Sequence, residues 1–352
     1  MTERKRRSQS LLFARTFFIS SCVFAVLAMG GALFAQNYIQ PPQPPPLTMG
    51  SLQDSLEGEE PDEADGLWAG LRAPEGFTDE DRRELFYTFL IVGLDANSIT
   101  DTIMVASFDG ASNTASVVSI PRDTRVNVAR NYRKINVAHS AGQRFGGTPD
   151  GGIRQLKREV RSLIGFEPDF FVEINMAAFT RIIDAVGGVT VDVPFHMRYD
   201  DPFQGLHIDI PAGLQRLDGE QALQFARFRN ANRGFRAIND YQRMENQQIL
   251  IEAMLQSLLT PASILRIPEF ISIFEENVNT DIRAQDMLWF ASRLPDVGGV
   301  DALSTYTLSI ARNSGPPNWY EFVDAAAALE LVNSALNPFT IPIGVDDVDI
   351  VQ

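Results

Sequence analysis

Three apolar, β-branched runs separated by turn-rich residues constrain the fold of this chain more than any other feature. They are Phe89–Leu94, Thr102–Phe108 and Ala115–Ile120. Runs of this length and composition, bounded by turn residues, predict three buried strands of one sheet. Pro121 follows the third run and cannot donate a hydrogen bond to a neighbouring strand, so we expect the strand to stop there.

Charged side chains lie where these strands are expected to end. Asp95 follows the first run, Asp101 opens the second, and Arg122 follows the third. Side chains at neighbouring strand ends can meet at one point, the usual place for a site in an open α/β sheet. Each acid taken alone is more readily a turn residue than a ligand, because Asp favours turns. Together, two carboxylates and an arginine indicate a metal ion bound with a phosphate.

Helical and strand patterns alternate through the rest of this region, which predicts an α/β fold with a mixed central β-sheet sandwiched between α-helices. No internal repeat is visible. The expected helices are Lys134–Gly142, Ile153–Ile164, Met176–Val186, Gly219–Arg227 and Asp240–Leu259, and the further strands are Phe170–Ile174 and Val189–Val193. Between the last strand and the helix at Gly219, His207–Ile210 is followed by an expected loop, AGLQRLDG.

The N-terminus predicts one membrane span. Residues 1–15 are basic, and Thr16–Ala35 carries no charged residue, a length that crosses roughly 30 Å of hydrocarbon as a helix. A basic flank stays in the cytoplasm, so residues 1–15 are expected as a cytoplasmic tail, 16–36 as a signal anchor, and the rest as extracytoplasmic. A cleaved signal peptide is the alternative, although its apolar region would be shorter and small residues would precede the cut.

Residues 37–84 are predicted to be a linker. Gln40–Pro46 reads QPPQPPP, a stiff polyproline spacer that would lift the domain off the bilayer. From Asp54 to Glu84 there are 12 acids against 3 arginines, so this segment is expected to be solvated and mobile as far as Phe77. Repulsion of anionic lipid or wall polymer is the alternative interpretation of these acids.

Arginine dominates the basic residues of the central region. Between Leu85 and Leu258 there are 16 arginines among 18 basic residues. Arginine matches phosphate oxygens bidentately, which suits a phosphate site, but a GC-rich genome would also favour it. Arg227 and Arg229 are two residues apart and would point the same way on an extended segment, gripping one diphosphate. A solvated arginine pair is the alternative.

Other kinds of chemistry have little support. The single cysteine, Cys22, lies in the apolar N-terminal run, and the histidines His139, His196 and His207 show no ligand spacing, so zinc is not expected. Acyl transfer and nucleotide use lack their usual glycine-containing motifs. Nucleic acid is not expected as a partner of a chain with a net charge of -15.

An ordered set of short motifs resembles the LytR-CpsA-Psr (LCP) family of cell-envelope glycopolymer transferases. The motifs are GLD ending at Asp95, TDT at Thr100–Thr102, SIPRDT at Ser119–Thr124, KIN at Lys134–Asn136, Gly151–Gly152, DAVGGVTVDV from Asp184, LDGEQAL, FARFR, and Gln247–Gln248. The resemblance implies an LCP-type α-β-α domain. Members similar to this chain transfer a glycopolymer from an undecaprenyl-pyrophosphate carrier to peptidoglycan, using Mg²⁺ and a hydrophobic pocket for the lipid.

The same resemblance implies roles for individual residues. Asp95 and Asp101 match the metal-linked acids, and with Arg122 they form the expected catalytic set. Arg122, Arg227, Arg229 and Gln247 match residues that hold the pyrophosphate. Two positions depart from the pattern, because Ile99 and Asn246 stand where arginine is usual. Arg233, Arg236 or Arg243 can replace the missing charge, and the sequence leaves the choice open.

The resemblance sets the expected domain limits and leaves two functions open. Residues 85–312 are predicted to be the extracytoplasmic catalytic domain, with its motifs in 89–258, and residues 313–352 a C-terminal extension with a local helix and a frayed end. The first function is a membrane-anchored phosphotransferase of cell-wall assembly. The second is a non-catalytic polyprenyl-phosphate binder of the envelope, and a polyprenyl pyrophosphatase is a hydrolytic variant of the first. The identity of the glycopolymer and of the acceptor hydroxyl stays open.

Overall fold

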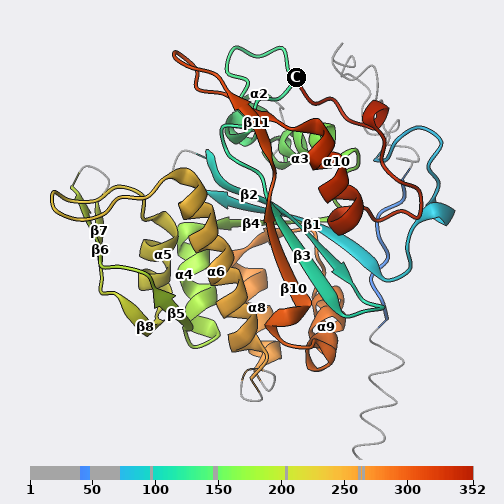
Figure 1. Cartoon of the computed structure of the whole chain (residues 1–352). Helices are drawn as coiled ribbons and strands as arrows, with labels where there is room; N and C mark the ends of the chain where they lie inside the picture. Colours follow the sequence, from blue (N-terminus) through green and yellow to red (C-terminus); the bar gives the residue numbers. More distant parts are fainter. Residues whose placement is uncertain are drawn as a thin grey trace, which may run out of the picture.

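The computed structural model describes residues 40–47, 72–95, 98–145, 150–202, 205–260, 263 and 266–351. At its centre lies a six-stranded sheet in the order β10-β3-β2-β1-β4-β9 (Figure 1). The sheet is mixed, because β1 pairs antiparallel with β2 but parallel with β4, and β3 pairs parallel with β10. The strands are β1 (Phe86–Leu94), β2 (Thr100–Asp109), β3 (Thr114–Ser119), β4 (Phe170–Asn175), β9 (Asn279–Thr280) and β10 (Leu303–Thr307).

The three strands predicted first are confirmed, and alternation along them divides the sheet into two faces. On one face Leu90, Val105 and Val118 lie in register across β1, β2 and β3, and all three are buried. On the other face Ile91 is in register with Met104, which is also buried. Both faces therefore need a covering layer.

Helices supply that layer on both sides, which confirms the predicted α/β architecture (Figure 1). The face of Leu90 packs against α3 through Leu156 and Val160, and against the segment after α10 through Leu336. The opposite face is covered by the longest helix, α6, and by neighbouring helices. The helices are α2 (Ala138–Phe145), α3 (Gly151–Ile164), α4 (Met176–Ala185), α5 (Gly219–Arg227), α6 (Asp240–Leu258), α8 (Ile267–Asn277), α9 (Ala284–Arg293) and α10 (Ala325–Leu331).

A second apolar core lies beside the sheet and fixes the position of α5 and α6. Phe225 and Phe228, at the end of α5, are fully buried in it together with Leu217 and Leu250. Two antiparallel strand pairs complete this core, a β6–β7 hairpin and the pair of β5 with β8 that flanks it in the chain. The strands are β5 (Val189–Val193), β6 (Met197–Asp201), β7 (Leu206–Ile210) and β8 (Gly213–Leu217).

The C-terminal segment packs against the main core, so the expectation of a frayed end was wrong. After β10 the chain forms a hairpin of β11 (Ile310–Asn313) and β12 (Glu321–Val323), and then α10. Leu336, Phe339 and Ile343 beyond this helix are all buried in the core of the sheet. These apolar side chains hold residues 313–351 to the domain.

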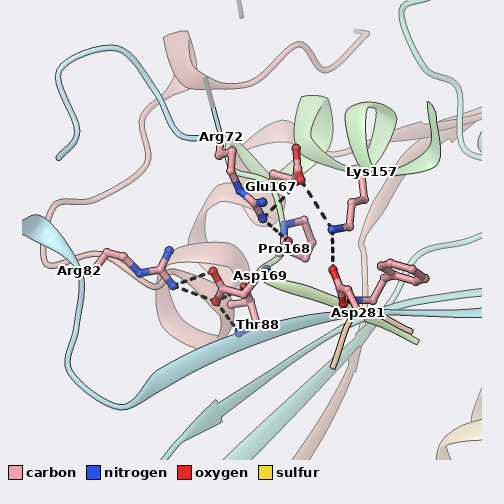
Figure 2. A network of polar contacts seen from close by, with 9 residues as sticks. Arg72, Arg82, Thr88, Lys157, Glu167, Pro168, Asp169 and Asp281 are labelled. Carbon is pink, nitrogen blue, oxygen red and sulfur yellow. Dashed lines mark hydrogen bonds and ion pairs between the residues drawn. The ribbon is translucent and has the colours of Figure 1, made fainter. Parts of the chain in front are cut away.

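The described part of the N-terminal segment also packs on the domain. Pro42 accepts a hydrogen bond through its carbonyl from the Tyr87 hydroxyl at 3.1 Å, and Leu47 is buried. The expectation of a free polyproline spacer is therefore wrong for residues 40–47. Closer to β1, the guanidinium of Arg82 donates to both carboxylate oxygens of Asp169 at 2.8 Å, just before β4 (Figure 2).

The expected membrane span at Thr16–Ala35 lies outside the described residues. Among the residues that the structure does describe, no helix combines the length and apolar character needed to cross a bilayer.

Candidate functional site

The ends of β1 and β3 and the start of β2 lie at one edge of the sheet, as antiparallel pairing requires. Asp101 is the second residue of β2, and Arg122 follows β3 by three residues. The Arg122 guanidinium donates through Nη1 to Oδ1 of Asp101 at 2.7 Å. This edge therefore joins two of the three side chains that the strand ends were predicted to bring together.

Asp95 lies at the same edge but closes a turn. Its Oδ1 accepts a hydrogen bond from the N–H of Ile99 at 2.8 Å, and the Asp95 N–H donates to the carbonyl of Ile99 at 3.0 Å. Asp95 therefore stabilises a turn, which is the alternative that the sequence left open for this acid. Because a carboxylate has several lone pairs, the turn does not prevent Asp95 from also binding a cation.

Asp240 is the centre of the charged cluster, although no sequence motif marks it as a site residue. It is the first residue of α6, directly after the N-cap Asn239. Its carboxylate lies 3.3 Å from Nη2 of Arg122, 3.3 Å from Nε of Arg229 and 3.4 Å from Nη2 of Arg243. One acid therefore holds three arginines from three separate segments, and the helix N-terminus adds a favourable field for its charge.

Arg243, one of the three arginines predicted as a replacement for the missing charge, lies in the cluster. It is 7% exposed, and burial lowers the pKa of its guanidinium, with a further lowering by the charge of Arg122 and an opposing effect of Asp240. Of the three arginines proposed to replace missing charge, Arg236 instead lies over the ring of Phe195, 4.8 Å from its centroid. Arg243 is therefore the candidate that the packing of α6 supports.

Arg122 keeps its charge despite partial burial. Burial on its own would lower the pKa of this guanidinium, but the charge of Asp240 and the hydrogen bond and charge of Asp101 raise it above its ordinary value. The two acids thus hold Arg122 cationic and oriented at the sheet edge, which is what binding of a phosphate oxygen requires.

Arg227 and Arg229 do not share an extended segment, so that part of the prediction was wrong. Arg227 is the last residue of α5, and the buried ring of Phe228 separates the two side chains. Arg229 reaches Asp240, whereas Arg227 forms no ion pair or hydrogen bond with the described residues. Of these two arginines, Arg229 contacts Asp240. A role of Arg227 in binding the pyrophosphate stays a prediction.

The two glutamines of α6 differ in their surroundings. Gln248 donates to the Ser119 hydroxyl at 2.9 Å and to the carbonyl of Tyr306 at 2.8 Å, so it fastens α6 to the sheet. The Oε1 of Gln247 is buried and has no hydrogen-bond partner in the part of the chain that the structure describes. Asn246, where the family often has arginine, is buried and donates to the carbonyl of Phe225 at 3.4 Å, so it links α6 to α5.

Within the described residues, several buried polar atoms of Arg122 and of α6 have no hydrogen-bond partner. They are Nε of Arg122, Nε of Arg243, Oδ1 of Asp240 and Oε1 of Gln247. A buried polar atom without a partner costs about 1–3 kcal/mol, so such atoms are rare in native structures. A ligand that offers oxygen atoms to both guanidinium groups would satisfy two of them at once.

An apolar cavity of about 300 Å³ lies between the sheet and helices α6 and α9. It is on the same sheet face as Ile91, and Phe89 in its wall precedes Asp95 by six residues, or about 20 Å along an extended strand. The distance from the charged cluster to the cavity along α6 is similar. Leu255 in the cavity wall lies 15 residues after Asp240, which is about 22 Å along a helix. Side chains of the cavity wall include Phe89, Phe108, Ala115, Leu255 and Phe290.

Asp95 and Asp101 suit a magnesium ion, which takes several of its ligands from phosphate and water. They suit less well a metal ion that is coordinated by protein side chains alone. Among the described residues, no group of three or more His, Cys, Asp or Glu side chains is arranged to hold a metal. Mg²⁺ is often bound through one or two carboxylates together with phosphate oxygens and water. Asp101 fits such a site because Arg122 occupies Oδ1 alone and the side chain is 43% exposed.

Comparison with known proteins agrees with the fold and the motifs. The chain is 29% identical over 245 residues to the polyisoprenyl-teichoic acid–peptidoglycan teichoic acid transferase TagV of Bacillus subtilis, covering 67% of this chain and 59% of that protein. It is 28% identical over 206 residues to TagU of the same organism, covering 57% of this chain and 61% of TagU. The chain thus spans about three fifths of the length of these relatives.

A solved structure and a family model complete the comparison. The crystal structure of B. subtilis TagV matches with a TM-score of 0.59 and 25% identity, covering 72% of this chain and 96% of that chain. The model of the LytR_cpsA_psr family matches residues 74–336. Because this match includes the sheet, the arginine cluster and the C-terminal hairpin, the chain belongs to the LytR_cpsA_psr family.

Proposed function

We propose that this protein transfers a glycopolymer from a polyprenyl-pyrophosphate carrier to peptidoglycan during cell-wall assembly. One observation carries the proposal: the buried Arg243 and the half-buried Arg122 lie around Asp240 at the start of α6, and an apolar cavity lies near the end of this helix. A ligand that matches both ends has an anionic head and a long apolar tail. The relatives TagV and TagU, named as polyisoprenyl-teichoic acid–peptidoglycan teichoic acid transferases, support this choice of substrate class.

In the proposed reaction, the arginines stabilise charge that develops on the phosphoryl oxygens. An acceptor hydroxyl attacks the phosphorus that carries the glycopolymer, and the bond from this phosphorus to the bridging oxygen breaks, releasing polyprenyl phosphate. Arg122, Arg229 and Arg243 are positioned by Asp240, and Arg227 and Gln247 lie on the adjoining helices. Preorganised cationic donors of this kind are a major source of catalysis in phosphoryl transfer.

We propose that Mg²⁺ binds at Asp95 and Asp101. When bound, the ion neutralises charge on the diphosphate oxygens. Without it, two carboxylates beside a diphosphate repel the substrate. Arg122 holds the carboxylate of Asp101 at the sheet edge, where it can meet a metal and a phosphate together.

The metal proposal predicts that Mg²⁺ tightens binding of a prenyl pyrophosphate and that Asp101→Ala abolishes this dependence. Calorimetric titration of the lipid with Mg²⁺ or with EDTA measures the effect. Asp123→Ala is the matched control, because Asp123 is an acid at the same edge that pairs with Lys134 at 2.7 Å and should leave the Mg²⁺ response intact. Equal affinity of the wild-type protein with EDTA and with Mg²⁺ would remove the metal from the proposal.

The cavity gives a second expected result, concerning the lipid tail. Ala115→Phe places a ring in the cavity wall and should weaken binding of a long-chain prenyl pyrophosphate by about tenfold or more, because the tail loses buried apolar area. Ala111→Phe makes the same change at an exposed turn between β2 and β3 and should bind as the wild type does. Equal binding by both variants would place the tail elsewhere.

Transfer itself is the decisive test. The wild-type protein, a synthetic polyprenyl-pyrophosphate-linked glycopolymer, Mg²⁺ and a peptidoglycan oligomer are incubated together, and a label on the glycopolymer is followed into the oligomer. Label in the oligomer supports the transferase. Release of label without acceptor joining indicates a pyrophosphatase, and tight lipid binding without either reaction indicates a non-catalytic binder.

The proposal also includes a cellular location. We propose that residues 16–36 anchor the chain in the cell membrane as a single span with residues 1–15 in the cytoplasm, and that residues 85–312 act outside it. Both lipid-linked donor and peptidoglycan would then be within reach of one domain.

A further inference from the structure

The hairpin of β11 and β12 brings an acidic side chain, Glu321, to the candidate site. The N–H of Glu321 donates to the carbonyl of Asp123 at 3.0 Å, and its carbonyl accepts from the N–H of Arg125 at 2.8 Å. Asp123 directly follows Arg122 in the chain. The backbone of Glu321 is therefore fixed along the loop that begins at this arginine.

The side chain of Glu321 is connected to the same cluster from a second direction. The Tyr241 hydroxyl donates to Oε1 of Glu321 at 3.2 Å. Tyr241 follows Asp240, whose carboxylate lies 3.3 Å from Arg122. Two independent segments, the loop after β3 and the start of α6, thus place this carboxyl group beside the proposed diphosphate site.

Within the described residues, the Glu321 carboxylate forms no ion pair. The nearby cation Lys134 is paired with Asp123 at 2.7 Å instead. A partly buried carboxylate beside other acids and without an ion pair is the kind of group whose proton affinity is raised at functional sites. Among the described residues, the Tyr241 hydroxyl is its polar side-chain partner, and it orients the carboxylate without neutralising it.

The surroundings of Glu321 make it a stronger base than an ordinary glutamate. Partial burial raises the pKa of its carboxyl, and the negative charges of Asp123 and Asp240 raise it further. The hydrogen bond from Tyr241 and the charge of Lys134 lower the pKa, but the net shift is upward. A carboxylate whose pKa is closer to neutral accepts a proton more effectively during attack by a hydroxyl group.

We propose that Glu321 accepts the proton of the attacking sugar hydroxyl, an inference that rests on the proposed transferase function. The hydroxyl oxygen bonds to the phosphorus that carries the glycopolymer while its proton moves to Oε of Glu321. The bond from phosphorus to the bridging oxygen breaks, and its electron pair leaves with the polyprenyl phosphate. Glu321 then returns the proton to solvent, so that atoms and charge balance.

An acceptor can approach Glu321 from the solvent side. Trp319, two residues earlier in the chain, is 60% exposed, and the ring of Tyr241 is also partly exposed. The apolar cavity for the donor lipid lies at the far end of α6, about 20 Å away. Donor and acceptor therefore have separate routes to the arginine cluster.

Glu321→Gln tests this role, because glutamine keeps the shape of the side chain and an oxygen to accept from Tyr241. We expect turnover to fall by about a hundredfold or more while binding of the prenyl pyrophosphate is unchanged. In the wild-type protein kcat/KM should fall as the pH drops through the raised pKa of Glu321, since only the carboxylate accepts a proton. This acidic limb should be absent from the pH profile of the glutamine variant.

Tyr241→Phe is an independent test that keeps the carboxylate. Loss of the hydroxyl removes a hydrogen bond that lowers the pKa of Glu321, so the acidic limb should move to higher pH. A limb that stays in place in Tyr241→Phe, or full turnover by Glu321→Gln, overturns the proposed role while transfer by the wild-type protein still supports the transferase. Absence of transfer by the wild-type protein overturns both.

Discussion

Replacing Arg122 by alanine is expected to lower turnover by about a hundredfold or more, while binding of the prenyl pyrophosphate falls much less. The guanidinium is held by Asp101 at 2.7 Å and by Asp240 at 3.3 Å, so it is in place before charge develops on the phosphoryl oxygens. By analogy with a lost oxyanion donor, its removal costs about 2.7–4 kcal/mol in the transition state. Steady-state transfer assays and lipid titrations on the same protein measure the two effects.

Two further variants test whether the loss of turnover in Arg122→Ala is specific to the planar guanidinium of this residue. Arg122→Lys keeps the charge but not the planar fork, so it should restore turnover only in part. Arg266→Ala removes an exposed arginine whose partner is Glu269 on the same helix, and it should leave turnover unchanged. If turnover of Arg122→Ala falls only in step with lipid binding, the guanidinium acts in ground-state binding and not on the transition state.

Removal of the Asp169 carboxylate is expected to destabilise the fold by about 3–5 kcal/mol. Asp169 is 1% exposed, and its carboxylate accepts from Arg82 as well as from the N–H and hydroxyl of Thr88 at 2.9 Å (Figure 2). Asp169→Ala leaves the guanidinium of Arg82 largely buried without a charge partner. The free energy of unfolding from urea denaturation of wild type and variant measures the loss.

An exposed ion pair gives the matched comparison for Asp169. Glu269→Ala breaks the pair with Arg266, in which both side chains are at least half exposed, and should change the free energy of unfolding by at most about 1 kcal/mol. Equal losses in the two variants would contradict the structural role assigned to the Arg82–Asp169 pair, which joins the segment before β1 to the start of β4.

The strands and their common edge could be predicted from the sequence because their signals are local. Alternating or continuous apolar runs gave β1, β2 and β3, and antiparallel pairing then required Asp101 and Arg122 to meet at one edge. The glycine of the GLD motif has a packing reason as well, since a Cβ at Gly93 would lie 2.9 Å from Cβ of Thr102 on the neighbouring strand.

The role of Asp240 could not be predicted because it depends on tertiary packing. At the start of a helix an acid is expected for capping and for the helix field alone. Its contacts with Arg122 and Arg229 arise because the second apolar core fixes how α6 lies against the sheet and the end of α5.

The relation of Arg227 to Arg229 was predicted wrongly, although the helix Gly219–Arg227 was itself expected. Because this helix includes Arg227 and the buried Phe228 follows it, the two arginines do not lie on one extended segment. No local signal predicted that Glu321 lies beside Tyr241 at the start of α6. The two residues are 80 positions apart in the chain, and no motif connects them.

The contact between Pro42 and Tyr87 shows at which end of β1 the described N-terminal segment meets the domain. Tyr87 lies near the start of β1, and its ring packs against Phe290, which also lines the apolar cavity; Asp95 and the arginines lie beyond the other end of the strand. If residues 16–36 anchor the chain as proposed, the tether joins the domain at the cavity end. A prenyl tail could then enter from the bilayer side, while the phosphates and the acceptor hydroxyl would meet on the side turned toward the wall.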